Sequence, residues 1–480
     1  MKMPLALATA ILLALVGCAE ETPSDDAEPP DATAGFGNYP YCPDDTILCS
    51  NLPANDILLP QGCESFDQQC SRNFYSWQAF VSLNWPGKII NAPEGVQLVE
   101  PDPDAGVGDD GNRVWELWMD PDDVFLPGAK RPSWTPGPTT SPYCDATGTA
   151  KALAGRSAKA SVAFDLDPDQ FFEATIQQPL IDQDLNFTVF EIRMNRQEVG
   201  WVIQNGLYVR ETVANWPSTD SLTMPSDAIE TKASWRIIPD DMPAAQKERY
   251  YRQTANIVLD PSHVDGGGTE PVCLTRELGL VGLHIRLNGL WSTFEQVDNV
   301  VADGEIQPTY NNPTCGDCAT NVPPTDQAGN PIKTSDYKWS TTGPSAALYE
   351  GFPNVPAQIT RGPGQDQWID KQMNHWWQTE VLQGTVWQHY MLITTNWLEL
   401  STSQPVPALN TTLEPFLPPH RDLPQACIDC HKLAVNGKGA SMAETFLVFR
   451  ACPKTSRSLA GDVLPPNCTP AGVDTLASNP

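Results

Sequence analysis

Proline is the residue type that most restricts how this chain can fold. The sequence contains 46 prolines in 480 residues. Proline has no backbone N–H and its ring breaks the interior of a helix, so long helices should be few and irregular connections many. Apolar residues nevertheless make up 40% of the chain and aromatic residues 9%, which is enough to bury a large core. We therefore predict a folded body built from short elements.

The spacing of apolar residues predicts where these elements lie. A buried helix is expected near residues 73–84, around Trp77. A second helix is expected within 364–383, with Ile369, Met373, Trp376 and Trp377 on its buried side. Segments rich in β-branched and aromatic residues, separated by Asn-Gly, Pro-Asp and Gly-rich turns, predict strands at 187–194, 200–208, 234–238, 256–259, 280–287 and 390–400. The predicted fold class is α+β, with a β-rich body over 41–410 that comprises one domain or two.

The charge balance argues against one class of partner. The chain has 29 Lys and Arg against 59 Asp and Glu, a net charge of −30. Binding to nucleic acid phosphates requires clustered basic side chains, which this composition does not supply. We therefore expect no nucleic-acid partner.

The N-terminus carries the pattern of an export signal. After Lys2, an apolar run of 13 residues extends from Pro4 to Val16 without a charge. A helix of that length rises about 20 Å, too little for a hydrocarbon core of about 30 Å. The sequence Leu15-Val16-Gly17-Cys18 resembles a bacterial lipobox. We predict a lipoprotein signal peptide over 1–17 and a lipidated Cys18; an ordinary secretory signal with a Cys near the cleavage site is the alternative.

Residues 18–40 are predicted to form a disordered acidic tether after the lipidated Cys18. They contain six acidic residues, no basic residue and no hydrophobic pattern, so burial cannot offset the entropy of ordering them. The body is then expected at the bacterial cell envelope, on the periplasmic side or at the outer membrane. Lipid rather than charge would hold it there, because anionic headgroups repel an acidic protein.

The cysteines divide into two groups. Of the 13, Cys18 is assigned to lipid, and Cys427 and Cys430 to the motif described below. The other ten fit five disulfides in an oxidising compartment, with no pairing fixed by the sequence. They are Cys42, Cys49, Cys63, Cys70, Cys144, Cys273, Cys315, Cys318, Cys452 and Cys468. We expect the first four to staple the N-terminal part of the body, Cys452 and Cys468 to staple the tail, and Cys315 and Cys318 to form a structural disulfide.

One motif is specific to a chemistry. The segment Cys427-Ile-Asp-Cys430-His431 is the pattern of a c-type haem attachment site. Two thiols at this spacing each form a thioether to a haem vinyl group, and the adjacent His then becomes an axial ligand of the iron. The alternative is a disulfide followed by a surface His. We predict one covalent haem c in a C-terminal segment, 411–480, which is short and mainly irregular or helical and packs on the body.

The ligand on the other side of the iron is left open by the sequence. Met442 and His284 are the leading candidates, and an open or water-filled position is the third possibility. The remaining candidates are His375, His389, His420 and Met391. Each of these residues also has a simpler interpretation as part of a packed core. A His/Met pair suits electron transfer, whereas an open position permits chemistry on peroxide or small gases.

The motif and the lipobox make the chain resemble exported bacterial monohaem c-type cytochromes. Three further segments resemble a group of large haem-bearing exported bacterial proteins: 179–183 with Glu191 and Asn195, then 279–299, then 382–387. This resemblance implies haem attachment at Cys427, Cys430 and His431, and it implies no catalytic residue. His284 matches the group. Gln296 stands where the group is expected to have His, and His389 where it is expected to have Asn, so both depart from it.

Three functions compete at this point. The first is electron transfer through the haem, with the acidic surface docking a redox partner that has a basic docking surface. The second is a haem enzyme of the peroxidase or oxygenase type, whose large body shapes a substrate pocket. The third is an assembly or sensor protein in which the haem is structural. Electron transfer is the primary prediction, and the size of the body is what favours the enzyme.

Overall fold

The structure is a computed structural model of the chain, and all the residues that it describes lie in one compact unit within 36–480. The described residues are 41–43, 46, 48–53, 57–58, 60, 63, 68–137, 151–154, 178–259, 261–299, 307–323, 332, 337–344, 356–360, 368–397, 410–416, 431, 434–442, 444–445, 447–454 and 468. The predicted signal peptide, Cys18, the tether, His420, Cys427 and Cys430 lie outside these ranges, so those predictions stay open.

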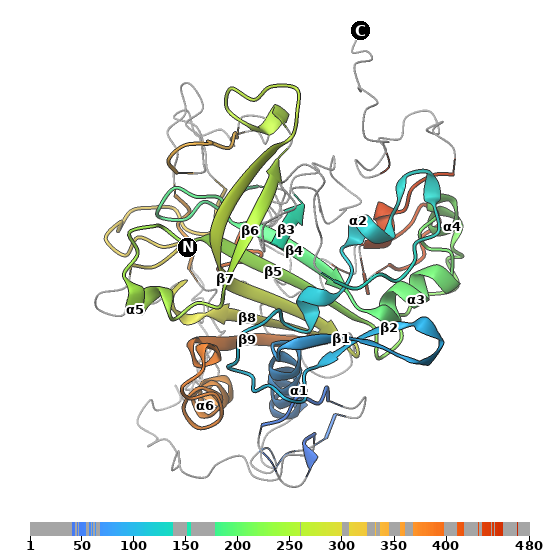
Figure 1. Ribbon diagram of the computed structural model, residues 1–480, viewed down its shortest axis with the longest axis horizontal. Coiled ribbons are helices and arrows are strands. Elements are labelled where there is room, and N and C mark those ends of the chain that lie inside the picture. Colours follow the sequence, from blue (N-terminus) through green and yellow to red (C-terminus); the bar gives the residue numbers. More distant parts are fainter. Residues whose placement is uncertain are drawn as a thin grey trace, which may run out of the picture. The chain divides into compact units, whose positions relative to one another are not determined.

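A seven-stranded sheet runs through the described residues (Figure 1). Its strands are β3 (Lys151–Ala154), β4 (Val189–Met194), β5 (Ile229–Ile237), β6 (Arg252–Leu259), β7 (Val272–Leu287), β8 (Leu290–Gln296) and β9 (Tyr390–Trp397). Strands β4, β5, β7, β8 and β9 are neighbours in that order, and all of these pairs are antiparallel. Strand β6 pairs with the first half of β7, and β3 lies parallel to β6. The fold is α+β, as predicted.

The β7–β8 hairpin shows how the sequence sets the register of the sheet. Leu287 pairs with Leu290, and Asn288 and Gly289 between them have φ angles of 52° and 71°. Both values belong to the left-handed region that an Asn-Gly pair tolerates best, and such a two-residue turn matches the twist of the strands. The turn fixes which residues of β7 and β8 stand opposite each other, although strand β8 itself was not predicted from the sequence.

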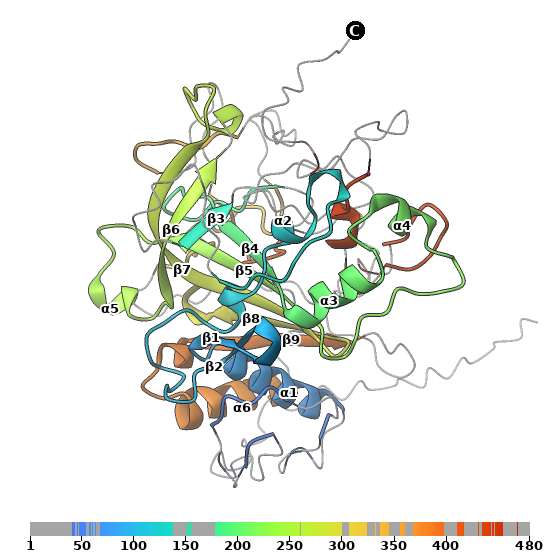
Figure 2. The same ribbon diagram turned by 45° about the vertical axis from the view of Figure 1, so that its right-hand side comes forward.

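One face of the sheet is covered by helices that carry large aromatic side chains. Helix α1 (Gln68–Leu83) and helix α6 (Trp368–Trp376), which continues in a π-helical turn over Trp377–Val381, both lie against β9 (Figures 1 and 2). Trp77 stacks on Trp377 with ring centroids 5.5 Å apart and meets Phe294 of β8 edge-on at 5.0 Å. The burial of these rings makes this the main apolar core.

The remaining elements are short, in keeping with the proline content. Strands β1 (Gly87–Asn91) and β2 (Gln97–Pro101) form a separate antiparallel hairpin. The other helices are α2 (Pro121–Val124), α3 (Arg196–Gln204), α4 (Arg210–Asn215) and α5 (Ala244–Lys247). Turns of 3₁₀ helix occur at Pro93–Gly95, Trp115–Leu117, Pro127–Ala129, Pro261–His263, Val297–Asn299, Val386–His389 and Leu447–Arg450. In both ribbon views the C-terminal described residues lie beside α4, and Val209 bridges to Cys452.

Most of the predicted elements are present. The helix expected near 73–84 is α1, which begins five positions earlier, and the helix expected within 364–383 is α6 with its π-helical turn. Met373, Trp376 and Trp377 are buried as expected, and the side chain of Ile369 lies outside the described part. The strands expected at 187–194, 234–238, 256–259, 280–287 and 390–400 correspond to β4, β5, β6, β7 and β9.

The strand expected at 200–208 is wrong, because this segment begins inside helix α3. Asn195 caps that helix by accepting a hydrogen bond from the backbone N–H of Glu198 at 2.9 Å. Val199 and Val202, three positions apart, are then buried on one side of the helix. A good cap and a helical pair of apolar residues thus outweigh the β-propensity of the segment.

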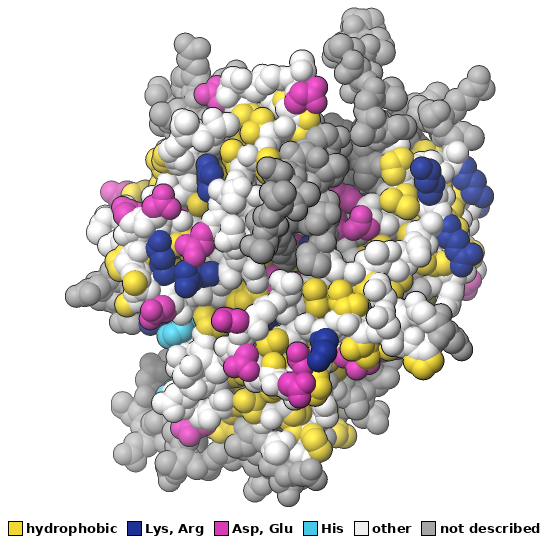
Figure 3. Space-filling model, in the orientation of Figure 1, with side chains coloured by type: hydrophobic (Ala, Val, Ile, Leu, Met, Phe, Trp, Pro, Cys, Tyr) yellow, Lys and Arg dark blue, Asp and Glu magenta, His cyan; other side chains and the backbone are white. Residues whose placement is uncertain are grey.

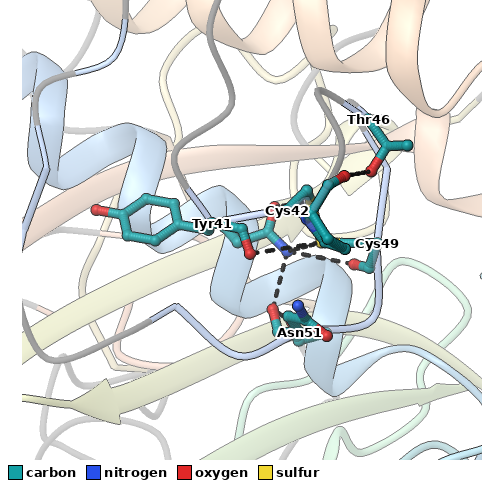
Figure 4. Close-up of a disulfide and its surroundings, with 8 residues drawn as sticks. Tyr41, Cys42, Thr46, Cys49 and Asn51 are labelled. Carbon is teal, nitrogen blue, oxygen red and sulfur yellow. Dashed lines mark hydrogen bonds between the residues drawn. A yellow bond between two sulfur atoms is a disulfide. The ribbon is translucent and has the colours of Figure 1, made fainter.

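Four disulfides join described cysteines, and each is local. They are Cys42–Cys49, Cys63–Cys70, Cys315–Cys318 and Cys452–Cys468, and Cys273 is also disulfide-bonded. The expected staples at the N-terminal part, at residues 315–318 and in the tail are confirmed. Figure 4 shows the Cys42–Cys49 bridge beside Asn51; Gln78 of α1 donates to the backbone oxygens of Cys49 at 3.2 Å and Asn51 at 2.9 Å, which ties this loop to the helix.

Candidate functional site

Six polar or aromatic side chains point from one face of three neighbouring strands. In the register of the sheet, Arg286 stands opposite both Glu230 and Trp291, and His284 stands opposite both Lys232 and Thr293. Directly opposed residues of antiparallel strands project to the same face, and so do residues two apart along one strand. The two rungs therefore place all six side chains together, on the face opposite the large aromatic core.

A pocket opens over these two rungs. It has an empty volume of about 400 Å³, which includes space open to solvent, and eight residues line it. They are Glu230, Lys232, His284, Arg286, Trp291, Thr293, Glu414 and His431. The first six come from the sheet and the last two from the C-terminal part of the chain. The pocket thus lies between segments that are more than a hundred residues apart in the sequence.

His431, the His of the predicted haem motif, lies at this pocket. Its residue is only 8% exposed, and its ring lies 5.3 Å from the ring of Trp291, with the planes tilted by 60°. The imidazole therefore borders a small, partly open pocket and packs against an indole ring.

A second imidazole, that of His284, lines the same pocket and is held by Asn410. Asn410 accepts hydrogen bonds at Oδ1 from the backbone N–H groups of Leu413 (2.7 Å), Glu414 (2.9 Å) and Thr412 (3.3 Å). These bonds assign the amide orientation, so that Nδ2 is the atom 3.3 Å from Nε2 of His284. Nδ2 can only donate. Nε2 of His284 therefore accepts, and the proton of this neutral imidazole is on Nδ1.

Two ion pairs fasten the C-terminal segments to the sheet beside the pocket. Lys232 Nζ lies 3.6 Å from Glu414 Oε1, and Arg286 pairs with Glu444. The Lys232 and Arg286 side chains are only 3% and 5% exposed. Glu414 and Glu444 come before and after the motif at 427–431, so the two cations anchor the chain on both sides of His431. Buried pairs of this kind are costly to break, because one charge is left without its partner.

A carboxyl group without a hydrogen-bond partner lies next to this cluster. Glu198 of α3 is fully buried, and neither of its oxygens accepts or donates a hydrogen bond. Burial raises the pKa of Glu198 well above its usual value, the charge of Glu230 raises it further, and Arg286 opposes both effects. Burial also raises the pKa of Glu444, again against the effect of Arg286. The positive charge of Arg286 thus acts on two carboxyl groups, those of Glu198 and Glu444.

The other predicted iron ligands lie elsewhere. Met442 is fully buried in an apolar cluster with Ala434, Ala440, Leu447 and Val448, and it is not among the residues that line the pocket. His375 is exposed at the end of α6. His389 follows α6 in a 3₁₀ turn, where burial and then Arg249 lower its pKa, and Met391 is partly buried on β9. Gln296 donates to Asp298 at 2.9 Å.

Sequence reasoning missed most of the pocket. It singled out His284 and His431, but not the lining residues Lys232, Arg286 and Trp291. It also missed Asn410 and Glu198, which lie beside the pocket. A signal was present, because charged residues at alternate positions of apolar strands, such as Glu230 with Lys232 and His284 with Arg286, must share one face. Asn410 follows a proline-rich segment that carries no periodic pattern, and its position gives no comparable signal.

The described part of the chain contains neither a cluster of metal-binding side chains nor a membrane-spanning helix. No group of three or more His, Cys, Asp or Glu side chains there is arranged to hold a metal ion. None of the described helices combines the length and apolar character that crossing a bilayer requires. No protein-family model, curated protein or solved structure matches the chain.

Proposed function

We propose that the protein is a c-type haem protein that transfers electrons at the bacterial cell envelope. In this proposal Cys427 and Cys430 hold the porphyrin, His431 is an axial ligand of the iron, and lipid on Cys18 holds the body at the membrane. When bound, the haem supplies the one-electron chemistry. The single observation that carries the proposal is the position of His431, which lines a pocket together with a second imidazole, that of His284.

The residues around this pocket support the proposed axial ligand rather than the porphyrin itself, because the pocket is small and its lining is mostly charged. An axial imidazole needs a rigid setting, and Trp291 packs against His431 on one side. The second imidazole and the buried hydroxyl of Thr293, whose Oγ1 has no hydrogen-bond partner, supply polar atoms on the sheet side of the pocket. The ion pairs of Lys232 and Arg286 hold the chain on both sides of the motif. A precisely held ligand is what electron transfer needs, because little then has to rearrange when the charge changes.

The proposed partner is a redox protein with a basic docking surface. On the face in Figure 3, acidic side chains are spread over several elements, and some of them are paired. Near α5, Lys247 and Arg252 lie 3.9 Å and 2.5 Å from Glu277, and Arg249 lies 2.5 Å from Asp298. With a net charge of −30, the attraction for a basic partner comes from the whole protein rather than from one patch on this face.

A second function is favoured by one observation, the hydrogen bond between Asn410 and His284. A His284 ligand would have to release Asn410 before Nε2 could bind iron. If it does not, a haem held by His431 would lack a His284 ligand, and His284, Arg286 and Thr293 would be the polar groups available at the pocket. A general base beside a buried cation suits the cleavage of peroxide. We therefore keep a peroxidase-type enzyme as the alternative.

The attachment of haem is tested with the full-length protein, expressed in a host that matures c-type cytochromes. We expect haem staining on a denaturing gel for the wild type and none for the double variant Cys427→Ala/Cys430→Ala. The matched control is Cys315→Ala/Cys318→Ala, which removes a Cys-X-X-Cys pair without an adjacent His and should keep the stain. An unstained wild type, or staining that survives loss of Cys427 and Cys430, overturns the proposal.

Optical spectra separate the carrier from the enzyme. Low-spin spectra in both oxidation states, unchanged by carbon monoxide or cyanide, support electron transfer; rapid binding of either ligand supports the enzyme. For a low-spin protein, His284→Ala should open the iron to carbon monoxide, and Met442→Leu should not. The opposite result assigns the position to Met442. Anchoring is tested separately, since Cys18→Ser should release the protein from the membrane fraction.

A further inference from the structure

The Cys315–Cys318 disulfide belongs to a sequence motif that the proposed function does not use. Its two cysteines lie in the irregular segment 307–323 and are partly exposed, and Gly316 and Asp317 between them are exposed. A Cβ atom added to Gly316 would meet no atom of the described residues within 4 Å, apart from its two chain neighbours. Among the described residues, none therefore blocks a thiol from approaching the bridge on this side.

The other three disulfides between described cysteines are harder to reach. The cysteines of Cys63–Cys70 and Cys452–Cys468 are all buried, and none is more than 6% exposed. Cys42–Cys49 is partly exposed, but Nε2 of Gln78 lies 3.5 Å from the Cys49 sulfur, so helix α1 packs against that bridge. Exposed disulfides are the ones that exchange most readily with thiols. By this criterion Cys315–Cys318 is the most reactive of the four.

Cys315–Cys318 is also the bridge that should stabilise the fold least. Its cysteines are 3 positions apart, whereas those of the other three bridges are 7, 7 and 16 positions apart. In the chain-entropy description, a disulfide stabilises a protein by restricting its unfolded chain, and a shorter closed loop gives a smaller restriction. The fold should therefore lose little stability when this bridge is opened.

Hydrogen bonds hold the chain on both sides of the bridge without involving its sulfurs. Before it, the backbone N–H of Asn312 donates to Gln358 Oε1 at 3.0 Å, and Asn312 Oδ1 accepts from the N–H and hydroxyl of Thr314 at 3.0 and 2.7 Å. After it, Oδ1 of the buried Asn321 accepts from the N–H and hydroxyl of Thr360 at 2.9 and 3.0 Å, and its Nδ2 donates to the Thr360 carbonyl at 2.7 Å. Both thiols should thus stay at the surface after reduction.

We propose that Cys315–Cys318 is a site of thiol–disulfide exchange, at which a dithiol protein reduces the bridge while the body stays folded. This site is independent of the proposed haem. A thiolate of the partner attacks one sulfur, which breaks the Cys315–Cys318 bond, forms an intermolecular disulfide and releases the other cysteine as a thiolate. The second thiol of the partner then attacks the intermolecular disulfide. The partner leaves as a disulfide, and its two electrons and two protons end on Cys315 and Cys318 as two thiols.

The first test measures how easily each bridge of the full-length protein is reduced. The protein is incubated with graded concentrations of dithiothreitol, the new thiols are alkylated, and the cysteine peptides are quantified by mass spectrometry. We expect Cys315–Cys318 to open at a dithiothreitol concentration about tenfold lower than Cys42–Cys49, the matched partly exposed control, with unchanged near-ultraviolet circular dichroism. Opening of both bridges together, or loss of the folded signal as Cys315–Cys318 opens, overturns the proposal.

The second test uses a protein dithiol. A thioredoxin whose second active-site cysteine is replaced by serine cannot complete the exchange, so the intermolecular disulfide accumulates. We expect a covalent complex on a non-reducing gel, with the thioredoxin linked to Cys315 or Cys318 in peptide mass spectra. The absence of a complex, or linkage only to other cysteines, overturns the proposal.

Thermal unfolding separates this role from a structural one. The variant Cys315→Ser/Cys318→Ser should unfold close to the wild-type temperature, whereas Cys452→Ser/Cys468→Ser, which opens a longer loop, should unfold at a clearly lower temperature. A Cys315→Ser/Cys318→Ser variant that fails to fold, or that loses as much stability as the other variant, overturns the proposal, because the bridge is then needed for the fold.

Discussion

The indole ring of Trp291 lies 5.3 Å from the imidazole ring of His431, with the two planes tilted by 60°. Trp291 belongs to β8, and His431 follows 140 positions later. The contact joins the sheet to the chain that carries the Cys-X-X-Cys-His motif. Because both residues are only 8% exposed, the two rings shield each other from water.

Replacement of Trp291 should measure this contact. We expect Trp291→Ala to lower the free energy of unfolding by about 3 kcal/mol, because it removes buried aromatic surface and leaves a cavity beside His431. Trp291→Phe keeps a ring there and should cost clearly less. Urea unfolding of the three proteins provides the measurement. Equal stabilities for the Ala and Phe variants would show that the ring contact contributes nothing.

The ion pair of Arg286 with Glu444 should contribute more to the stability of the fold than the pair of Lys232 with Glu414. The Glu444 side chain is 13% exposed and that of Glu414 is 33% exposed. Water therefore solvates the Glu414 carboxylate better than the Glu444 carboxylate when the partner cation is removed. We expect Arg286→Met to destabilise the fold by about 3 kcal/mol, and Lys232→Met by less.

A double-mutant cycle tests that explanation. Adding Glu444→Gln to Arg286→Met should restore part of the lost stability, because no uncompensated carboxylate then remains at that position. Losses that simply add in the double variant would mean that Arg286 stabilises the fold through contacts other than Glu444.

Gly282 lies where the chain at 410–416 packs directly on the sheet. A Cβ atom on Gly282 would lie 2.1 Å from Thr412 Oγ1, 2.6 Å from Ser234 Oγ and 2.9 Å from Leu413 Cδ1. We expect Gly282→Ala to cost about 1–3 kcal/mol of stability, since the covering segment must move away.

Helix α3 offers a matched control for this change. Gly200 is a helical glycine with no atom within 4 Å of an added Cβ. Gly200→Ala should therefore be neutral or raise the stability by up to about 1 kcal/mol. Thermal unfolding of both variants compares them, and a neutral Gly282→Ala would contradict the close approach.

Asp182 should make stability depend on pH. Burial raises its pKa to about 7, with Arg236 opposing the rise. In the unfolded chain a free Asp ionises near pH 4, so between about pH 4 and 7 the folded protein binds a proton that the unfolded chain has lost. Stability contributed by this group is therefore present at low pH and is lost as the pH rises through that window.

The variant Asp182→Asn isolates this effect. Asn keeps an acceptor for the backbone N–H groups of Asp184 and Asn186, and Arg236 keeps its partner Asp184 at 2.6 Å. We expect the stability of the variant relative to wild type to increase between pH 4 and pH 8, by at most about 4 kcal/mol. Urea unfolding at several pH values measures the difference. A difference that stays constant with pH would be evidence that the carboxyl group is ionised throughout.

Local patterns in the sequence predicted several of the local elements. The helical recurrence of aromatic residues around Trp77 predicted α1, and the β-branched segment after Tyr390 predicted β9, whereas strand β8 was not predicted. Each signal lies within a dozen residues of the element it specifies. The one wrong strand lay where the Asn195 cap, a local signal of another kind, was overlooked.

The pocket could not be predicted in the same way, because it depends on pairings between distant strands. Alternation shows that Glu230 and Lys232 share a face, but only the register of β5 with β7 brings them opposite Arg286 and His284. The choice between His284 and Met442 likewise depends on tertiary packing. Met442 enters an apolar cluster, and His284 reaches the pocket.

The two sides of the pocket are synthesised at different times. The sheet side is complete once Trp291 and Thr293 have been made, whereas Glu414, His431 and Glu444 belong to the last part of the chain. Since synthesis runs from the N-terminus, the strands can pair before the motif exists, and docking of the motif is then a late, long-range step. Until that step the sheet side of the pocket exposes Lys232 and Arg286 without the Glu414 and Glu444 carboxylates that pair with them in the finished fold.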